Sequence, residues 1–367
     1  MNQAILIPAV TFEKVSKRYG GITAVDAIDF SIASGTLVTL LGPSGCGKTT
    51  TLRMIAGLET PSEGRILIGD EDVTGLPASQ RDVSMVFQSY ALFPHMTVME
   101  NVCYGLRASG IAKRRAEELA ADKLSTVGLS GFEKRLPSEL SGGQQQRVAV
   151  ARAIVLEPKV LLFDEPLSNL DVKLRRRVRE DIRSLQQQLS LTAVYVTHDQ
   201  EEALAVSDRI IVMRNARIVQ DGTPRKLYEE PADRFIADFI GNANLLPVHA
   251  ERIDATTARV RLHGVTLTLP SRGLLDGTAT RDDLALAVRP QAIKLREGRA
   301  GQNELGGIIR KTVYLGGHVE YEVAIEGLGA DVLVIAPETA RPLPPETPVI
   351  LELQAQGAAL VSADQHS

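Results

Sequence analysis

A glycine-rich segment, Gly42-Pro-Ser-Gly-Cys-Gly-Lys48-Thr49, constrains the fold of this 367-residue chain more than any other feature. It matches the pattern G-x-x-x-x-G-K-[ST] at every fixed position. A short apolar run with β-strand character, 37–41, leads into it, and a helix-compatible segment, 49–57, follows it. Glycines permit tight turns and helix N-termini attract anions, so this strand–loop–helix order predicts a phosphate-binding loop. We therefore expect an α/β domain that binds a nucleoside triphosphate.

The side chains of this loop suggest how the nucleotide is held. We expect Lys48 to place its ammonium at the β- and γ-phosphates and the Thr49 hydroxyl to ligate Mg²⁺. The other loop positions assigned to the nucleotide site are Gly42, Pro43, Ser44, Gly45, Cys46, Gly47 and Thr50. The structural alternative is a plain glycine turn with a solvated Lys48, which requires a chance match at all fixed positions.

An acidic pair follows a second apolar run. Residues 160–163 are apolar and lie between Pro158 and Pro166, which predicts a short buried parallel strand. Asp164 and Glu165 come at its carboxyl end, where open α/β sheets bind ligands. Asp164 can hold Mg²⁺ through water, and Glu165 can polarise the attacking water as a general base. A solvated acidic pair is the alternative, and the nearby phosphate loop favours the catalytic interpretation.

The segment Leu140-Ser141-Gly142-Gly143-Gln144, shortly before the acidic strand, resembles the signature of ABC-type ATPases. The other elements of that family occur in order: Tyr19 for adenine stacking, Gln88 of the Q-loop, Ser168-Asn-Leu-Asp171 as the D-loop and the switch histidine His198. The resemblance covers residues 12–240 closely and the rest more loosely. It implies that Gln88 reaches Mg²⁺ and the attacking water, and that His198, like Glu165, is a catalytic residue.

Each of these residues also has a structural interpretation when taken alone. Tyr19 could be a packed core tyrosine, Gln88 a surface amide, and His198 a satisfied histidine at a strand end. Asp171 could cap the helix that follows it, a role that is compatible with function. Their order along the chain favours the functional interpretation.

The signature segment has a physical logic of its own. Ser141 can cap a helix that runs from about 143 to 155, and Gly142 and Gly143 leave its first N–H groups open to an anion. The chain would then carry a second phosphate site at a helix N-terminus. In the family, the signature of one subunit covers the γ-phosphate held by the other, so the resemblance implies an ATP-dependent homodimer.

The chain length and the change of pattern along it predict two domains. Residues 1–240 form the expected nucleotide-binding domain, which combines antiparallel strands, a parallel-sheet core and a helical insertion at about 90–155. Short β-runs separated by glycine turns follow, so 241–367 is expected to be a small OB-like β-barrel.

Two segments of this second domain, Leu286-Ala-Val-Arg289-Pro290 and Tyr314-Leu-Gly-Gly317, resemble the accessory β-domain of importer ATPases. Gln291 stands where that family often has a glutamate. This departure favours a domain that stabilises the dimer over one that binds a regulator.

Composition excludes several classes of function. The net charge is −4 and the isoelectric point about 6.0, which argues against a nucleic-acid partner. No apolar run approaches the ~20 residues that a membrane helix needs, and the N-terminus lacks a signal-peptide pattern. Cys46 and Cys103 have no metal-site or disulfide spacing. A transport role would require a membrane part on another polypeptide.

The leading hypothesis is an ATP-hydrolysing subunit, peripheral on the cytoplasmic side of the inner membrane, that energises import of a small solute. Its partners would be integral permease subunits and, indirectly, a periplasmic or extracellular solute-binding protein. The chain resembles ATPases for polyamines, ferric iron and 2-aminoethylphosphonate, and its sequence does not select among these cargoes.

The alternative is a soluble ABC-type ATPase that is not coupled to transport. Translation ATPases usually carry two cassettes and repair ATPases carry coiled coils, neither of which is present, and GTPases or kinases would lack 140–144. The apolar segment 88–96 either docks a helix of the membrane subunit or packs within the insertion, and both readings remain open.

Overall fold

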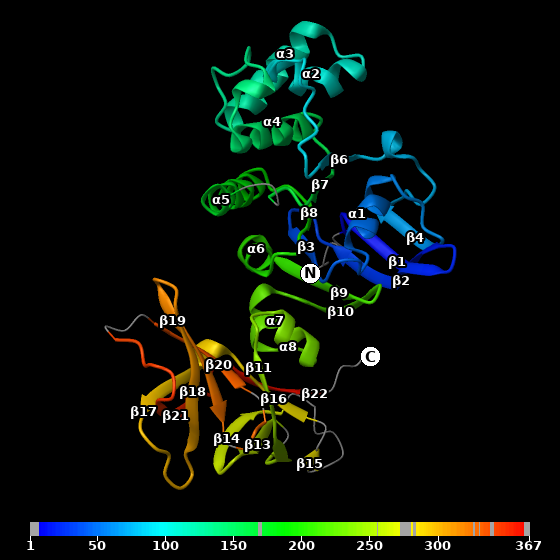
Figure 1. The fold of residues 1–367 in the computed structure, drawn as a ribbon. Helices are drawn as coiled ribbons and strands as arrows, with labels where there is room; N and C mark the ends of the chain where they lie inside the picture. Colours follow the sequence, from blue (N-terminus) through cyan, green and yellow to red (C-terminus); the bar gives the residue numbers. More distant parts are fainter. Residues whose placement is uncertain are drawn as a thin grey trace, which may run out of the picture. The chain divides into compact units, whose positions relative to one another are not determined.

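The computed structural model describes residues 7–167, 171–254, 256–271, 280–281, 284–325, 327–329, 331–337 and 341–362. Three residues of the predicted D-loop, 168–170, lie outside this part, whereas Asp171 lies within it. The chain divides into two compact units, Met1–Pro224 and Arg225–Ser367 (Figure 1). This division falls earlier than the expected boundary at Ile240, for a reason given below.

The first unit begins with an antiparallel sheet in the order β2-β1-β4-β5. Its strands are β1 (Val10–Tyr19), β2 (Ile22–Ile32), β4 (Glu63–Ile68) and β5 (Glu71–Asp72). Phe12 and Phe30 face each other across β1 and β2 with ring centroids 4.5 Å apart, and both are buried. The segment 12–30 is predicted to form antiparallel strands joined by a turn at Gly20-Gly21, and β1 and β2 form this hairpin.

A six-stranded sheet forms the centre of the first unit, in the order β10-β9-β3-β8-β7-β6. These strands are β3 (Leu37–Leu41), β6 (Val83–Val86), β7 (Val160–Asp164), β8 (Ala193–Val196), β9 (Arg209–Arg214) and β10 (Arg217–Gly222). Pairing is parallel from β9 to β6, and β10 adds an antiparallel edge. Residues of β3 and β8 are buried throughout because helices cover the sheet.

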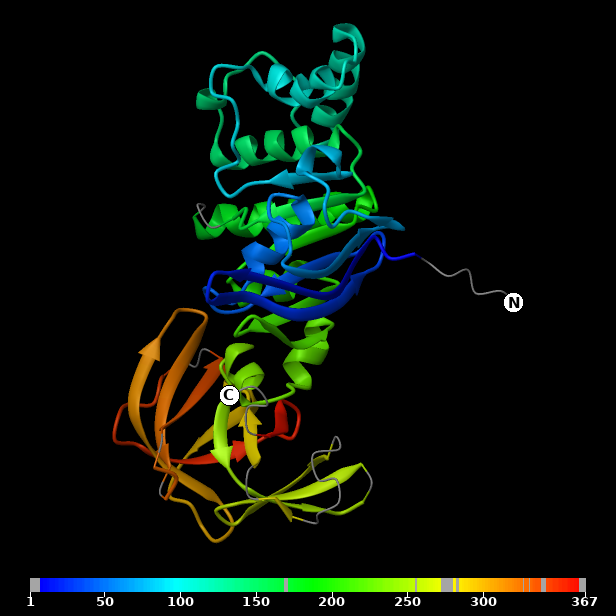
Figure 2. The ribbon, with the colours of Figure 1, turned by 90° about the vertical axis from the view of Figure 1, so that its right-hand side faces the viewer.

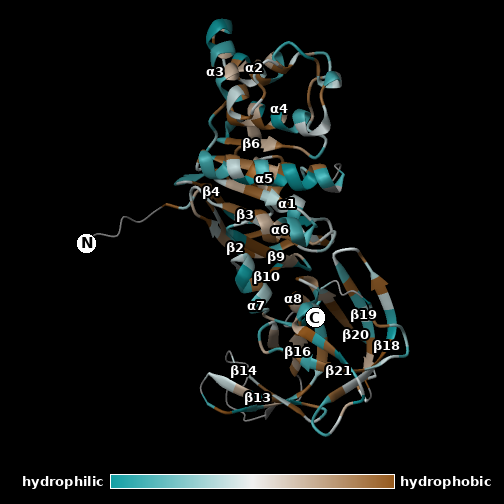
Figure 3. Cartoon of the chain, turned by 90° about the vertical axis from the view of Figure 1, so that its left-hand side faces the viewer, coloured by the Kyte–Doolittle hydropathy of each residue, from teal (hydrophilic) through white to brown (hydrophobic). Residues whose placement is uncertain are grey.

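The core helices are α1 (Lys48–Ala56), α5 (Val172–Gln188) and α6 (Gln200–Val206), with a 3-10 turn η1 (Ala78–Gln80). Apolar residues recur at helical spacing after Asp171, which predicts a helix with one buried stripe. In α5 this stripe packs against the core, where Val178 and Ile182 are buried. Its remaining surface is rich in hydrophilic residues (Figure 3).

The expected helical insertion comprises α2 (Val98–Ala108), α3 (Lys113–Thr126), the 3-10 turn η2 (Pro137–Glu139) and α4 (Gly142–Ile154). These helices gather at the end of the first unit beyond β6 (Figures 1 and 2). Helix α2 begins with a capping box in which Thr97 and Glu100 bond to each other's backbone N–H. Within the described residues, no helix is long and apolar enough to span a membrane.

The second unit consists mainly of antiparallel strands in three sheets, β11-β16-β22, β14-β13-β12-β15 and β17-β21-β18-β19-β20. Their bounds are β11 (Asn244–Pro247), β12 (His249–Arg252), β13 (Thr257–Leu262), β14 (Val265–Pro270), β15 (Thr280–Arg281), β16 (Leu284–Val288), β17 (Ile293–Glu297), β18 (Leu305–Tyr314), β19 (His318–Ile325), β20 (Asp331–Pro337), β21 (Pro348–Leu353) and β22 (Ala358–Ser362). One apolar core draws residues from all three sheets, including Leu246, Val260 and Val323.

The second unit also contains α7 (Pro224–Glu229), α8 (Arg234–Phe239) and the 3-10 turn η3 (Pro290–Ala292). The sequence predicts one helical segment over 224–240, but the helix is interrupted near Pro231. Proline cannot donate a backbone hydrogen bond, and Asp233 caps a new helix by accepting from the Ile236 N–H at 2.8 Å.

A buried arginine attaches these two helices to the strands of the second unit. Arg289 is 3% exposed and donates to the carbonyl oxygens of Tyr228 at 2.5 Å, Ala237 at 2.7 Å and Ile240. Its guanidinium also lies 4.2 Å from the Tyr228 ring centroid. The helices therefore belong to the second unit, which explains why the division falls before them.

Candidate nucleotide-binding and catalytic site

The register of the parallel strands brings the predicted site residues to one edge of the central sheet. Val196 of β8 lies opposite both Leu40 of β3 and Asp164 of β7. Val86 of β6 lies opposite Phe163 of β7. The segments that follow these strands carry the glycine-rich loop, Gln88, Glu165 and His198. This edge is where open α/β sheets bind ligands.

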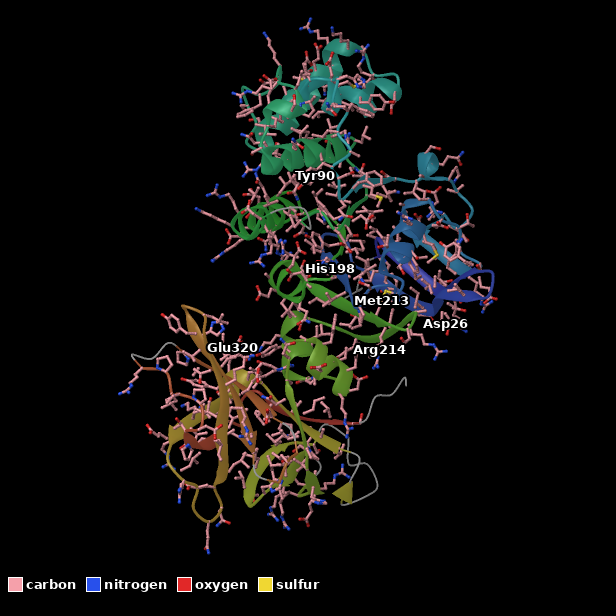
Figure 4. The ribbon with its side chains drawn as sticks, viewed as in Figure 1. Asp26, Tyr90, His198, Met213, Arg214 and Glu320 are labelled. Atoms are coloured by element: carbon pink, nitrogen blue, oxygen red, sulfur yellow. The ribbon has the colours of Figure 1, made fainter. Side chains whose placement is uncertain are left out.

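Two glycines of the loop lie so close to neighbouring backbone that no side chain fits. Gly42 has φ 155°, and a Cβ there would be 2.2 Å from the carbonyl oxygen of Met213 (labelled in Figure 4). Gly47 has φ 104°, and a Cβ there would be 2.4 Å from the carbonyl oxygen of Ala24. The loop is therefore fixed by contacts with β9 and β2, and α1 starts directly after it.

Lys48 lies inside this loop. Its ammonium donates to the carbonyl oxygens of Gly42 and Pro43, each at 2.8 Å, and the side chain is only 6% exposed. The solvated Lys48 of the structural alternative is therefore wrong. Cys46 is buried beside it, and this burial raises the pKa of the thiol. Among the remaining loop positions, Ser44 and Gly45 are exposed, and Pro43, Thr49 and Thr50 are half-buried.

The acidic pair sits at the end of β7, as expected. Burial raises the pKa of the half-buried Asp164 carboxyl, the charge of Glu165 adds to this, and Arg53 opposes it. Glu165 has a positive φ of 46°, and its N–H donates to the Val196 carbonyl at 3.1 Å. Such a conformation costs a non-glycine residue about 1–3 kcal/mol. The strand ends therefore hold the Glu165 backbone in an unusual orientation.

His198 lies against Glu165. Its Nδ1 is 3.2 Å from Glu165 Oε2, and its side chain is 60% exposed, whereas that of Glu165 is 25% exposed. The histidine follows β8 and precedes α6 (Figure 4). It is thus a strand-end histidine that faces the acidic pair, and not one satisfied within the core.

A buried network beneath His198 was missed by sequence reasoning. Glu202 is 4% exposed and accepts from the Tyr195 hydroxyl at 2.5 Å and from the Thr197 hydroxyl. Asp199 caps α6 by accepting from the Glu202 N–H at 3.0 Å. An Asp followed three residues later by a Glu is a recognisable helix start, but only the fold shows that the Glu202 side chain turns inward.

Tyr19 is 45% exposed at the end of β1, so the core-tyrosine alternative is wrong. Lys17 Nζ lies 4.7 Å from its ring centroid. The pKa of the phenol is raised first by partial burial and then by Glu59, while Thr50 opposes the shift. Thr50 is on α1, so Tyr19 lies beside the helix that follows the glycine-rich loop.

Gln88 is exposed shortly after β6, and the segment after it packs into the helical insertion. Tyr90 is 7% exposed and lies next to α4, where Arg152 donates to its carbonyl oxygen at 2.8 Å (Figure 4). Asn101 of α2 donates to the carbonyl oxygens of Phe93 and Met96, each at 3.1 Å. These contacts show that the segment packs within the insertion, although Ala91, Pro94 and His95 remain exposed.

The signature residues lie at the start of α4, away from the glycine-rich loop of the core (Figures 1 and 2). Ser141 caps the helix through a capping box with Gln144, as the Ser141 N–H donates to Oε1 of Gln144 at 2.9 Å. Gly142 and Gly143 form the first turn. Asp171 caps α5 by accepting from the Leu174 N–H at 3.0 Å. One chain therefore does not bring its signature onto its own phosphate loop.

Two known protein families match parts of this chain. The ABC transporter family matches residues 25–168, and the TOBE domain family matches residues 286–361. The Fe(3+) ions import ATP-binding protein FbpC of Rhizobium etli is 59% identical over 354 residues, which are 96% of this chain and 98% of that protein. FbpC of Brucella abortus is 54% identical over 359 residues, covering 98% and 99% of the two chains.

A solved structure shows the same core fold. The chain cbiO1 from Clostridium perfringens, part of the ABC transporter complex cbiONQ, is 27% identical with a TM-score of 0.56. The match covers 61% of this chain and 91% of that one.

These matches confirm the predicted fold class, an ABC ATPase core followed by an OB-like β-domain. They also confirm that the chain binds ATP and that its hydrolysis is coupled to transport. The chain belongs to the family of ATP-binding subunits of ABC-type importers.

Proposed function

We propose that the edge formed by the ends of β3, β6, β7 and β8 is the ATP-hydrolysing site, and that the cargo it energises is ferric iron. The observation that supports this site is the shared register in which Val196 of β8 lies opposite both Leu40 of β3 and Asp164 of β7. The segments that follow these three strands carry Lys48, His198 and Glu165. The backbone N–H groups of residues 42–50 and the Lys48 ammonium would hold the phosphates, and Tyr19 would stack on adenine.

Glu165 is the proposed general base, and His198 orients it. The contact of 3.2 Å between His198 Nδ1 and Glu165 Oε2 places an imidazole against the carboxylate that would accept the proton of the attacking water. The strained Glu165 backbone keeps this carboxylate at the strand end. Asp164 is then free to bind Mg²⁺, as described next.

The residues present fit a Mg²⁺ ion. The described residues hold no cluster of three or more His, Cys, Asp or Glu side chains that could bind a metal. A hydroxyl from Thr49, the Asp164 carboxylate and the Gln88 amide oxygen are nonetheless the hard oxygen donors that Mg²⁺ accepts together with water and phosphate. When bound, the ion would neutralise charge on the β- and γ-phosphates.

Two copies of the chain are needed to complete this site. Ser141 to Gln144 start a helix in the insertion, and the phosphate loop belongs to the core. We propose that the signature N–H groups of one subunit cover the γ-phosphate held by the other, with Asp171 at the same interface. ATP would then bind the two subunits together.

The relatives support a proposal about the transport partners. Those reported above are named as ferric iron import proteins and match nearly the whole chain. We propose that the chain works on the cytoplasmic side of the inner membrane with integral permease subunits, and that a solute-binding protein outside delivers ferric iron to them.

A groove on the helical insertion suits a helix of such a permease. It encloses about 470 Å³, and its lining includes Met96, the α2 residues Met99, Cys103, Tyr104 and Arg107, and the α3 residues Lys113 and Glu117. Tyr104 is 48% exposed. The segment 88–96 begins at Gln88 near the nucleotide edge and ends at Met96, which lines this groove. A helix docked in the groove would therefore contact the same segment that carries Gln88.

Reconstitution tests this proposal. The chain is assembled with its permease subunits in liposomes, and ATPase activity is measured with the binding protein loaded with ferric iron, spermidine or 2-aminoethylphosphonate. We expect only the ferric form to stimulate hydrolysis and to drive uptake of radioactive iron. Stimulation by another cargo would refute iron specificity.

A further inference from the structure

Two successive residues shortly after Gln88 have a backbone conformation that non-glycine residues rarely adopt. Tyr90 has φ 59° and Ala91 has φ 47°. In this left-handed region the Cβ atom crowds the residue's own backbone, and a bulky residue such as tyrosine is a clear outlier there. Conformations of this kind persist only where the surrounding structure holds them. The segment therefore needs a restraint.

Arg152 of α4 supplies the polar part of this restraint. Its Nη2 donates to the Tyr90 carbonyl oxygen at 2.8 Å, and its Nη1 donates to the Ala91 carbonyl oxygen at 2.7 Å. The guanidinium also lies 5.6 Å from the Phe93 ring centroid. One side chain thus bonds to the carbonyl groups of both residues that have a positive φ.

The Tyr90 ring adds an apolar anchor and no polar one. The residue is 7% exposed and belongs to an apolar cluster that includes Val98 and Val102 of α2 (Figure 4). Its hydroxyl is buried and has no hydrogen-bond partner among the described residues. An unpaired buried hydroxyl is costly, so it weakens this anchor. The bonds from Arg152 are therefore the polar contacts that tie Tyr90 to α4.

Gln88 lies inside a turn that Tyr90 closes. The Tyr90 N–H donates to the Phe87 carbonyl oxygen at 2.9 Å, so Gln88 and Ser89 are the two central residues of a four-residue turn. Neither of these two has a positive φ. Because Tyr90 is the last residue of the turn, the backbone conformation that Arg152 holds also determines how the turn closes around Gln88.

We propose that Arg152 is a positioning residue for Gln88. Its hydrogen bonds hold the strained backbone of Tyr90 and Ala91, and this backbone closes the turn that presents the Gln88 amide to the nucleotide site. Arg152 lies near the end of the helix that Ser141 caps, so one helix carries the signature and restrains this turn. The role of Gln88 rests on the proposed function, whereas the hold of Arg152 on the turn does not.

Hydrogen exchange of the Tyr90 N–H, in the full chain without nucleotide, measures how often the turn opens. In Ala91→Gly the protection factor should rise about threefold, because glycine adopts a positive φ without strain. In Ala91→Val it should fall severalfold, because a β-branched residue is strained most there. The matched control is Ser89→Gly, at an exposed position without a positive φ, which should leave protection unchanged or lower. Lower protection in Ala91→Gly would overturn the proposal, since it would show a loop that is flexible and not strained.

Variants of Arg152 test the restraint itself. Arg152→Met removes both donors and should lower the Tyr90 protection factor about tenfold to a hundredfold, as the loss of a hydrogen bond to a charged group predicts. Adding Ala91→Gly should restore part of the protection, and adding Ser89→Gly should not. Arg152→Lys keeps the charge without the forked geometry and should show a smaller loss; it replaces Arg152→Met in these comparisons if the latter does not fold. Wild-type protection in the Arg152 variant, or equal rescue by both glycines, refutes the proposal.

The Mg²⁺ dependence of ATP hydrolysis tests the link to Gln88. Arg152→Met should raise the Mg²⁺ concentration at half-maximal rate severalfold, and Ala91→Gly should partly reverse this. ATP affinity measured without Mg²⁺ should stay near the wild-type value, which a general loss of structure would not allow. A raised Mg²⁺ requirement in Gln88→Ala but not in Arg152→Met refutes the positioning role. A wild-type requirement in Gln88→Ala instead refutes the proposed function of Gln88, and the exchange experiments then decide the hold of Arg152 on the turn.

Discussion

Glu202 offers a quantitative test of how the fold positions His198. The Glu202 carboxylate accepts hydrogen bonds from the Tyr195 and Thr197 hydroxyls, which are themselves buried. In Glu202→Ala both hydroxyls lose their acceptor, and each unpaired buried hydroxyl costs about 1–3 kcal/mol. The turn between β8 and α6 should therefore be destabilised by about 2–6 kcal/mol. His198 lies in this turn, so ATPase activity should fall as well.

Glu202→Gln is the matched control. The amide keeps the size of the side chain, its oxygen accepts from one hydroxyl, and the other hydroxyl can rotate to accept from the amide. Neutral bonds are weaker than bonds to a carboxylate by about 1–1.5 kcal/mol each, but the variant no longer buries a charge. We expect a net change of less than about 2 kcal/mol and nearly normal activity.

Native-state hydrogen exchange of the amides in β8 and α6 measures these effects locally, which suits a protein of two units. Exchange should accelerate about 30-fold to 10⁴-fold in Glu202→Ala, up to the limit of global unfolding, because each 1.4 kcal/mol is about tenfold. Wild-type protection in Glu202→Ala would refute the stabilising role of the network.

The pH dependence gives an independent check. Burial raises the pKa of Glu202, Asp199 adds to the rise, and the Thr197 and Tyr195 hydrogen bonds and Arg175 oppose it. The native state therefore binds this proton more tightly than the unfolded state, whose pKa is about 4.3. The stabilisation of the native state by protonated Glu202 is fully present below the unfolded pKa. It is lost as the pH rises through the pKa that Glu202 has in the folded state. Wild-type stability should thus fall relative to Glu202→Gln over this window, and an opposite slope would contradict the argument.

Four further predictions concern the site and the second unit. Lys48→Ala should abolish ATP binding or turnover, because the loop loses its full positive charge, and phosphate release within a few-fold of wild type would refute that role. Glu165→Gln should bind ATP normally and lose about 10²–10⁴ in turnover; single-turnover assays check this, and a loss below tenfold excludes a general base. Mixing Lys48→Ala with Ser141→Arg chains should restore part of the activity in mixed dimers, which a fully active Ser141→Arg homodimer would disprove. Arg289→Met strands the three carbonyl groups that Arg289 binds and should destabilise α7 and α8 by about 3 kcal/mol or more with ATP affinity unchanged, as hydrogen exchange and nucleotide titration will show.

The phosphate loop could be predicted from the sequence because its determinants are local. Gly42 and Gly47 need positive φ, and Lys48 and Thr49 follow at a fixed spacing before a helix. The N-caps at Ser141 and Asp171 were likewise visible, since a capping side chain bonds to a backbone N–H only a few residues later. Such features depend only on a few neighbouring residues, so they can be recognised without knowing the tertiary structure.

Several strands of the second unit were not predicted. Strands β11, β12 and β22 are four or five residues long and lack a clear alternation of apolar and polar residues, and β17 alternates over only four residues, Ile293 to Arg296. Their pairing partners supply the stability that their own sequences do not, as β22 shows by pairing with β16 along its whole length. Context of this kind is invisible to local patterns.

The sequence by itself determined the nucleotide chemistry, the order of the motifs and the two-part organisation, since each depends on residue types at fixed spacing. The tertiary structure decided which of these residues meet. Parallel register across β3, β7 and β8 brings His198 to Glu165, which is 33 residues away in the chain. It also turned Glu202 inward and committed Arg289 to helix carbonyls. These outcomes depend on contacts between segments that are distant in sequence. Burial at those contacts decides which polar side chains need a hydrogen-bond partner from the protein.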